Sequence, residues 1–252
     1  MKEQYVGDIG DFGKVLLLKH LAGLGFKIGV NWVLTKNDNR GDGKHRDYVG
    51  YRGKDSLCCC DEEVFERILP LAKAEKKDRK IEDLEALIRG FSGSVEFYPK
   101  KYIGGQKRKA FEDNAFAKLS PDLADLVFFD PDNGVDGEEG MSSKHVYFSD
   151  LKRYWARKQS LLTYHHLGRK DTHEAQIAQL KLDFQNEFPD GRIYTYHLRR
   201  GTARVYILCV RKEHLLKILD KDSIPAIEPL KVAKADWAKG KYCTKNHSVK
   251  PT

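Results

Sequence analysis

The residues best suited to chemistry lie in the stretch "DLVFFDPDNG", residues 125–134. Its apolar centre, Leu126–Phe129, has the length and composition of a buried strand. This strand is followed directly by Asp130, Pro131, Asp132 and Asn133. Carboxylates in this place can accept a hydrogen bond from a substrate or bind a metal ion. Asp, Pro, Asn and Gly also favour turns, so a polar turn that ends the strand is the alternative interpretation.

Helical and strand patterns alternate along most of the chain. Helices are predicted over 11–24, with Asp11 as the N-cap, over 61–89, with Pro70 as an interruption, and in "THEAQIAQLKLDFQNEF". Strands are predicted in "FKIGVNWVLT", "SVEFYP", "DLVFFD" and "QSLLTYHH", followed by the closing pair "RIYTYHLRR" and "ARVYILCV". A last short helix contains Leu215, Leu216 and Ile218.

This alternation predicts an α/β, Rossmann-like fold with a mainly parallel sheet and helices on both faces. The closing strands are joined too tightly for a helical crossover, so we expect a C-terminal antiparallel β-hairpin. In such sheets ligands bind outside the carboxyl ends of the strands, where "NDNRGDG", "DPDNG" and the "YHH" end of the fourth strand should meet. We expect one domain over residues 1–220 and a basic tail over 221–252.

The charge balance favours an anionic partner. The formal net charge is +8 and the pI is about 9.1, which is typical of proteins that bind nucleic acid. One segment, "PKKYIGGQKRK", gathers several cations, and we expect it to contact nucleic acid through Lys100, Lys101, Lys107, Arg108 and Lys109. A solvated loop is the alternative interpretation of this segment.

Composition also bears on location. No run approaches the roughly 20 apolar residues that a membrane-spanning helix needs, so no membrane association is expected. The first residues, "MKEQYVGDIGD", lack the apolar segment of a secretory signal. Cys58, Cys59 and Cys60 are consecutive and cannot easily bridge one another, and no CxxC pair is present. We therefore expect a reduced, cytoplasmic protein.

Two motifs resemble those of one known family. The chain has Gly7-Asp8-Ile9-Gly10-Asp11-Phe12-Gly13-Lys14 near its start and Asp130-Pro131-Asp132-Asn133 after a buried strand. It is similar in these places to class I S-adenosylmethionine (SAM) dependent methyltransferases, nearest the J-type 23S rRNA adenine-N6 methyltransferases. That family opens with G-N-x-x-D-x-x-K and carries D-P-P-Y after a strand, and the likeness in element order covers about residues 5–219. It implies a methyltransferase-like fold, SAM as cofactor and nucleic acid as substrate.

The resemblance also implies roles for particular residues. In the family, the motif's carboxylate and proline carbonyl accept hydrogen bonds from the exocyclic amine, which implies these roles for Asp130 and Pro131. SAM would be held by residues of the first motif and of the loop after the first strand: Gly7, Asp8, Asp11, Lys14, Asp38, Gly41, Asp42, Gly43 and His45.

The chain departs from the family pattern in two respects. Asp132 and Asn133 replace the second proline and the aromatic residue, so a flipped base would need Tyr164 or Tyr5 for stacking. No second strand ends in the acid that holds the SAM ribose. His165 joins the catalytic candidates from the fourth strand, and a buried, hydrogen-bonded histidine is its alternative interpretation.

Two other functions use the same residues. Clustered carboxylates would suit Mg²⁺ or Mn²⁺ in a metal-dependent nuclease or phosphoesterase, with ligands drawn from Asp8, Asp11, Asp38, Asp42, Asp130 and Asp132 and with His45 or His165 nearby. A non-catalytic nucleic-acid-binding protein on the same fold is the third possibility. The GxGxxG and GxxxxGK[ST] motifs are absent, so dinucleotide and P-loop nucleotide binding have no motif support.

Overall fold

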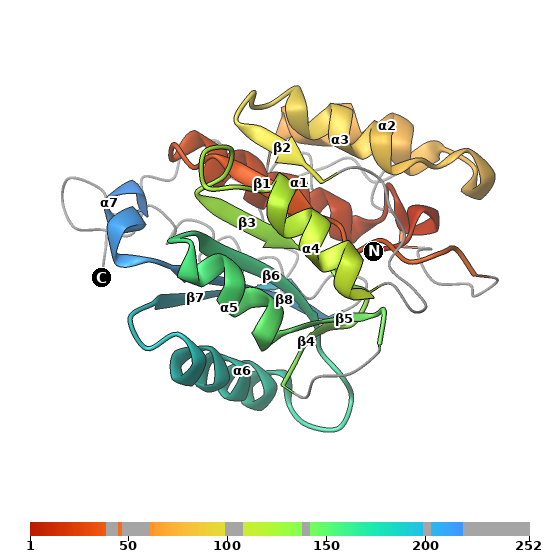
Figure 1. The fold of residues 1–252 in the computed structure, drawn as a ribbon. Coiled ribbons are helices and arrows are strands. Elements are labelled where there is room, and N and C mark those ends of the chain that lie inside the picture. Colours follow the sequence, from red (N-terminus) through yellow and green to blue (C-terminus); the bar gives the residue numbers. More distant parts are fainter. Residues whose placement is uncertain (39–44, 47–60, 99–107, 138–141, 199–202, 219–252) are drawn as a thin grey trace, which may run out of the picture.

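The structure is a computed structural model that describes residues 1–38, 45–46, 61–98, 108–137, 142–198 and 203–218. Its centre is a six-stranded sheet in the order β2-β1-β3-β6-β8-β7 (Figure 1). The strands are β1 (Ile28–Asn31), β2 (Val95–Phe97), β3 (Leu126–Phe129), β6 (Ser160–His166), β7 (Arg192–Leu198) and β8 (Arg204–Val210). Strands β2, β1, β3 and β6 are parallel, whereas β8 runs antiparallel to both β6 and β7. A small parallel pair, β4 (Gly134–Asp136) and β5 (His145–Tyr147), follows β3.

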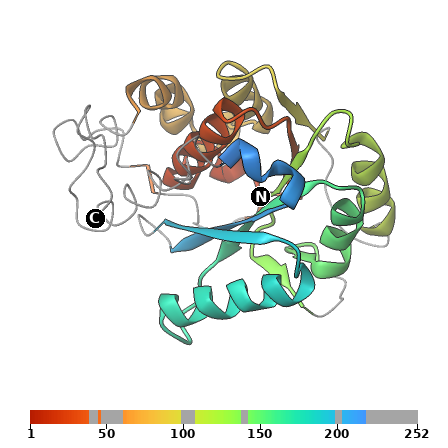
Figure 2. The same cartoon turned by 90° about the vertical axis from the view of Figure 1, so that its left-hand side faces the viewer.

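Helices cover both faces of the sheet. One group is α1 (Ile9–Gly23), α2 (Glu62–Lys73), α3 (Ile81–Arg89) and α7 (Leu215–Ile218), and the other is α4 (Arg108–Lys118), α5 (Phe148–Ala156) and α6 (His173–Glu187). Short 3-10 turns occur at Glu3–Tyr5, Lys76–Asp78 and Lys212–His214. Figure 2 shows α1, in red, and α6, in teal, on opposite sides of β7 and β8.

The alternation of side chains along β3 explains why the sheet needs helices on both faces. Leu126 and Phe128 belong to the core under α1, while Val127 and Phe129 belong to the core under α4, α5 and α6. All four side chains are fully buried. Each such burial stabilises the fold by about 1.5–3 kcal/mol, so the continuous apolar run is a direct consequence of the two-sided packing.

The predicted α/β class, mainly parallel sheet, two helical layers and antiparallel closing strands are confirmed. The predicted N-cap at Asp11 is wrong, because α1 begins at Ile9 and the Asp8 carboxylate accepts hydrogen bonds from the backbone N–H groups of Gly10 (2.7 Å) and Asp11 (3.2 Å). Pro70 does not interrupt its helix, since α2 continues past it to Lys73. The pair β4 and β5 and helix α5 were not predicted.

Several predicted features fall on residues outside the described part of the chain. These are the tail 221–252, the centre of the loop after β1 with Gly41, Asp42 and Gly43, and the residues Lys100, Lys101 and Lys107. Within the described residues, no helix has the length and apolar character needed to cross a membrane.

Candidate functional site

The carboxyl ends of the four parallel strands meet at one edge of the sheet, and the start of α1 packs against it. Here the Nζ atom of Lys14 donates hydrogen bonds to Asp11 Oδ1 (2.8 Å) and to Asp130 Oδ2 (2.7 Å). All three side chains are buried. We call Asp11, Lys14 and Asp130 the ion triad. It joins the two sequence motifs, which lie 116 residues apart at this contact.

The ion triad fixes the charge of its lysine. Burial lowers the pKa of Lys14, but the nearby carboxylates of Asp11 and Asp130 outweigh this effect and raise the pKa above its usual value. Burial raises the pKa of Asp11 to about 6, although Lys14 opposes that shift. The Lys14 ammonium also lies 5.3 Å from the centre of the Trp32 ring, a cation–π contact that helps to hold it in place.

A glycine with an unusual backbone conformation holds Asp11. Gly7 has φ of +85°, and its N–H donates to Asp11 Oδ2 at 2.9 Å. A Cβ atom at Gly7 would lie 2.4 Å from the Leu71 carbonyl oxygen. The position therefore requires glycine for both its backbone conformation and its contact with α2, which accounts for the glycine and the acid of the first motif in physical terms.

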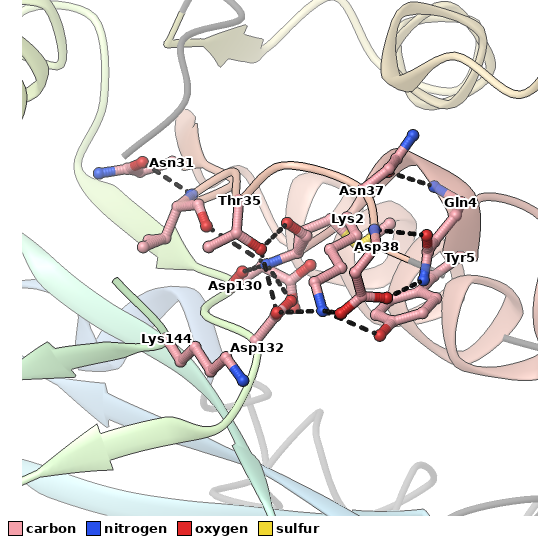
Figure 3. Close-up of polar contacts among 12 residues, drawn as sticks. Lys2, Gln4, Tyr5, Asn31, Thr35, Asn37, Asp38, Asp130, Asp132 and Lys144 are labelled. Carbon is pink, nitrogen blue, oxygen red and sulfur yellow. Dashed lines mark hydrogen bonds and ion pairs between the residues drawn. The ribbon is translucent and has the colours of Figure 1, made fainter. Parts of the chain in front are cut away.

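A second ion network surrounds Asp132 (Figure 3). Its carboxylate lies 3.1 Å from the Met1 amino group and 3.3 Å from Lys2 Nζ, and it accepts a hydrogen bond from Thr35 Oγ1 at 3.0 Å. Lys2 also binds Asp38 at 2.8 Å. Burial raises the pKa of Asp132, but the two ammonium groups outweigh it and hold the pKa below its usual value. Lys2 and Thr35 were not predicted, because nothing in their sequence neighbourhood indicates that they reach the "DPDNG" turn.

The carboxylates of the predicted metal cluster are divided between two lysines. Lys14 lies between Asp11 and Asp130, and Lys2 lies between Asp38 and Asp132. In the ranges that the structure describes, no group of three or more His, Cys, Asp or Glu side chains is arranged to hold a metal ion. Asp42 lies outside those ranges.

His165 faces the backbone of β4. Its Nδ1 atom accepts a hydrogen bond from the Val135 N–H at 3.2 Å, and burial, together with His166 and His145, lowers its pKa to about 4. The imidazole is therefore neutral at pH 7, with the proton on Nε2. The ring is hydrogen-bonded, as in the alternative interpretation, but it is half-buried rather than fully buried. Asn133 is exposed, and its backbone N–H donates to Lys144 O at 2.8 Å.

Aromatic side chains lie beside the ion triad on the α1 face. Tyr164 is half-buried, and its ring centre is 5.9 Å from that of Tyr206. Burial raises the pKa of Tyr164 to about 12, and the charges of Asp130 and Asp8 add to the shift. Tyr164, predicted as a stacking residue, therefore lies near Asp130. Arg204 is a residue that the sequence did not indicate; its Nη1 is 3.8 Å from Asp8 Oδ1.

The sequence also does not indicate the buried hydrogen-bond donor at the end of β1. The Asn31 side chain accepts a hydrogen bond from Val33 N–H at 3.1 Å through Oδ1, while its Nδ2 atom is fully buried and has no partner in the described part of the chain. The neighbouring strand β2 ends at Phe97 and is followed by Tyr98. A buried unpaired donor is costly in a folded protein unless a water or ligand satisfies it.

The remaining predicted residues are spread over the structure. His45 is exposed, and its carbonyl oxygen accepts from Ile9 N–H at 2.9 Å, next to the start of α1. Arg108 binds Asp150 at 2.7 Å and donates to the Ser142 carbonyl at 2.8 Å, so it holds α4 in place. Lys109 is exposed and remains available to an anionic partner.

Comparison with protein-family models gives no match, and no curated protein or solved structure matches the chain significantly.

Proposed function

We propose that this chain is a SAM-dependent methyltransferase that acts on an amino group in nucleic acid. The observation that carries the proposal is the ion triad, in which Lys14 of the first motif binds Asp130 of the second at 2.7 Å. The pair of β7 and β8 beside β6, in which β8 alone runs against the other strands, also supports the proposal, since the resemblance implies a terminal hairpin. The net charge of +8 supports nucleic acid as the substrate.

The Asp130 carboxylate is suited to orient an amine. Lys14 binds its Oδ2 atom, whereas Oδ1 accepts no hydrogen bond from the described residues. The Pro131 carbonyl likewise has no donor among the described residues. These two acceptors match the two N–H groups of an exocyclic amine and would leave its lone pair directed at the methyl donor. Because Lys14 fixes one carboxylate oxygen, the other is positioned before the substrate arrives.

The described residues fit a SAM molecule in one respect that can be tested. Asn31 Nδ2 is a buried donor without a partner in the described ranges, at the carboxyl end of β1, where ligands of parallel sheets bind. Asn31, together with the predicted loop 37–45, would hold the cofactor. SAM would supply an electrophilic methyl group there.

The metal-dependent alternative has less support. A divalent ion shared by Asp11 and Asp130 would have to displace Lys14, and one shared by Asp38 and Asp132 would have to displace Lys2. Each carboxylate pair already holds an ammonium group in the place that a metal ion would take. We therefore do not propose nuclease or phosphoesterase activity.

Two measurements test the proposal. Calorimetric titration with SAM should show saturable binding to the wild type and to Asp130→Asn, because Asn keeps the shape of the side chain. Transfer of labelled methyl from SAM to mixed-sequence RNA or DNA should fall at least about 100-fold in Asp130→Asn. Asp125→Asn is the matched control, since Asp125 lies at the opposite end of β3 and binds Lys217. Absence of SAM binding, or equal transfer by Asp130→Asn, would refute the proposal.

A further inference from the structure

Two arginines lie together beside the candidate site. Arg46 Nη1 donates to the carbonyl oxygens of Ala72 (3.0 Å) and Ala74 (2.7 Å). Arg79 Nε donates to the same Ala74 oxygen at 3.3 Å, and its Nη1 donates to the Gln4 carbonyl. The two guanidinium groups therefore share one acceptor, which brings two positive charges close together.

Within the described ranges, neither charge is paired directly with a carboxylate, by an ion pair or by a hydrogen bond. Arg79 is 7% exposed, and burial lowers its pKa, as does the charge of Arg46. Asp8 and Asp11 oppose this shift. Asp8 already caps α1, however, and Asp11 already binds Lys14.

A purely structural role explains only part of this arrangement. Ala72 and Ala74 lie at the C-terminal end of α2, where a cation satisfies free carbonyl groups and interacts favourably with the helix dipole. Arg46 alone already donates to both carbonyl oxygens. A second guanidinium at the same oxygen adds repulsion. Arg46 Nε and Nη2 and Arg79 Nη2 make no hydrogen bond with the described residues, so donors remain for a ligand.

We propose that Arg46 and Arg79 together bind a phosphate group of a nucleic acid. Paired guanidinium groups present several N–H donors in a plane and match the oxygens of a phosphate, which also removes the repulsion between the two charges. The pair is adjacent to the candidate site, because Arg79 binds Gln4, whose side chain binds Asp38. The choice of nucleic acid as the phosphate carrier rests on the proposed function.

The test is binding of a fluorescently labelled, mixed-sequence single-stranded oligonucleotide, measured by anisotropy at several salt concentrations. Arg46→Gln should bind about tenfold more weakly. The slope of log affinity against log salt concentration should become shallower by about 1, the value expected for the loss of one phosphate contact. Arg67→Gln is the matched control and should bind as the wild type does. Arg67 lies on α2 and, like Arg46, donates to a backbone carbonyl, that of Gly90 at 3.0 Å, but it has an acid partner in Glu63 at 3.5 Å.

A second measurement separates a folding defect from a binding defect. Inorganic phosphate, compared with chloride at equal ionic strength, should raise the melting temperature of the wild type and not that of Arg46→Gln. An unchanged oligonucleotide affinity and salt slope in Arg46→Gln would overturn the proposal. If phosphate stabilised only the wild type while oligonucleotide affinity stayed equal, the ligand would be a small phosphate compound and the nucleic-acid assignment would be wrong.

The phosphate site and the methyltransferase activity can be confirmed or refuted independently of each other. Loss of oligonucleotide affinity in Arg46→Gln, in a protein that shows no calorimetric signal with SAM, would support the phosphate site and refute the methyltransferase proposal. SAM binding together with an unchanged oligonucleotide affinity in Arg46→Gln would support the methyltransferase proposal and refute the phosphate site.

Discussion

Lys14 Nζ lies 2.7 Å from Asp130 Oδ2, and this buried contact holds the first turn of α1 against the end of β3. The lysine makes a second ion pair with Asp11 at 2.8 Å. Three charged groups are thus removed from water together, and the two carboxylates share a single cation. Removal of the lysine alone would leave two buried negative charges side by side, which is a costly arrangement.

Lys14→Met should therefore destabilise the protein by about 3–5 kcal/mol at pH 7, the usual cost of breaking a buried ion pair from one side. Urea unfolding followed by circular dichroism measures this loss. The deficit should narrow at pH 5, because Asp11, whose pKa is about 6 even beside Lys14, then takes up a proton.

Lys19→Met is the matched control for this experiment. Lys19 also lies on α1 and binds an acid, Asp61, at 2.8 Å, but its side chain is 28% exposed. The expected loss there is below about 1 kcal/mol. If the two variants lost equal stability, the buried ion triad would stabilise the protein no more than a partly exposed ion pair does.

The backbone of Gly7 gives a second prediction. Gly7→Ala should cost on the order of 2–4 kcal/mol, because the residue keeps φ of +85° and its new Cβ would lie 2.4 Å from Leu71 O. Gly25→Ala measures the backbone part of this cost alone, so the difference between the two variants gives the steric part. Gly25 has the same φ of +85°, but nothing lies within 4 Å of a Cβ there, so only about 1 kcal/mol should be lost. Equal melting temperatures for the two variants would contradict the proposed contact between Gly7 and α2.

The sequence predicts the fold well because its signals are local and strong. The continuous apolar run of β3 and the tight connection between β7 and β8 suffice for a mainly parallel sheet with an antiparallel end. Asp130 lies at the edge where the parallel strands end, and Asp11 and Lys14 reach it because the first turns of α1 pack against that edge. The sequence offers both Asp8 and Asp11 as caps, and the cap was predicted at Asp11 because two aspartates three residues apart satisfy the same capping pattern.

Long-range partners of charged groups were not predictable. Lys2, Thr35, Arg46, Arg79 and Arg204 lie in stretches without any motif, and their roles depend on which backbone turns reach the edge of the sheet. Arg204 sits at the start of an otherwise apolar strand, and burial of that strand is a signal that it needs an acidic neighbour, which Asp8 provides.

His165 gives a prediction about acid stability. Its pKa is about 4 in the folded protein, below the usual value of 6.5, so folding is favoured above pH 6.5 and this stability is lost as the pH falls toward 4. The loss should be on the order of 2 kcal/mol. In His165→Asn, whose amide oxygen can still accept the Val135 N–H, this part of the pH dependence should disappear. His166→Asn, a change at an exposed neighbour, should keep most of it, because burial is a larger cause of the low His165 pKa than the charge of His166. An unchanged acid profile in His165→Asn would show that the imidazole is not buried as described.

Glu112 should have the opposite effect on pH dependence. Its side chain is 4% exposed, and neither carboxyl oxygen has a hydrogen-bond partner in the described part of the chain. Arg108 Nη2 is 3.5 Å from Glu112 Oε1 but binds Asp150 more closely, at 2.7 Å. Burial, with Asp150 adding to it, raises the pKa of Glu112 to about 8. Because this folded value exceeds the usual 4.5, the wild type should lose stability as the pH rises from about 4.5 to 8.

Glu112→Gln removes this titration and should be more stable than the wild type at pH 9, by on the order of 2–4 kcal/mol, with a much smaller difference at pH 4. Urea unfolding of both proteins at a series of pH values gives the difference directly and cancels the contributions of other groups, including His165. Glu63→Gln, on the exposed face of α2, should show no such trend. A difference in unfolding free energy between Glu112→Gln and the wild type that stayed constant with pH would contradict this prediction. Glu112 would then ionise as easily in the folded protein as in the unfolded one, and its carboxylate between α4 and α5 would be compensated.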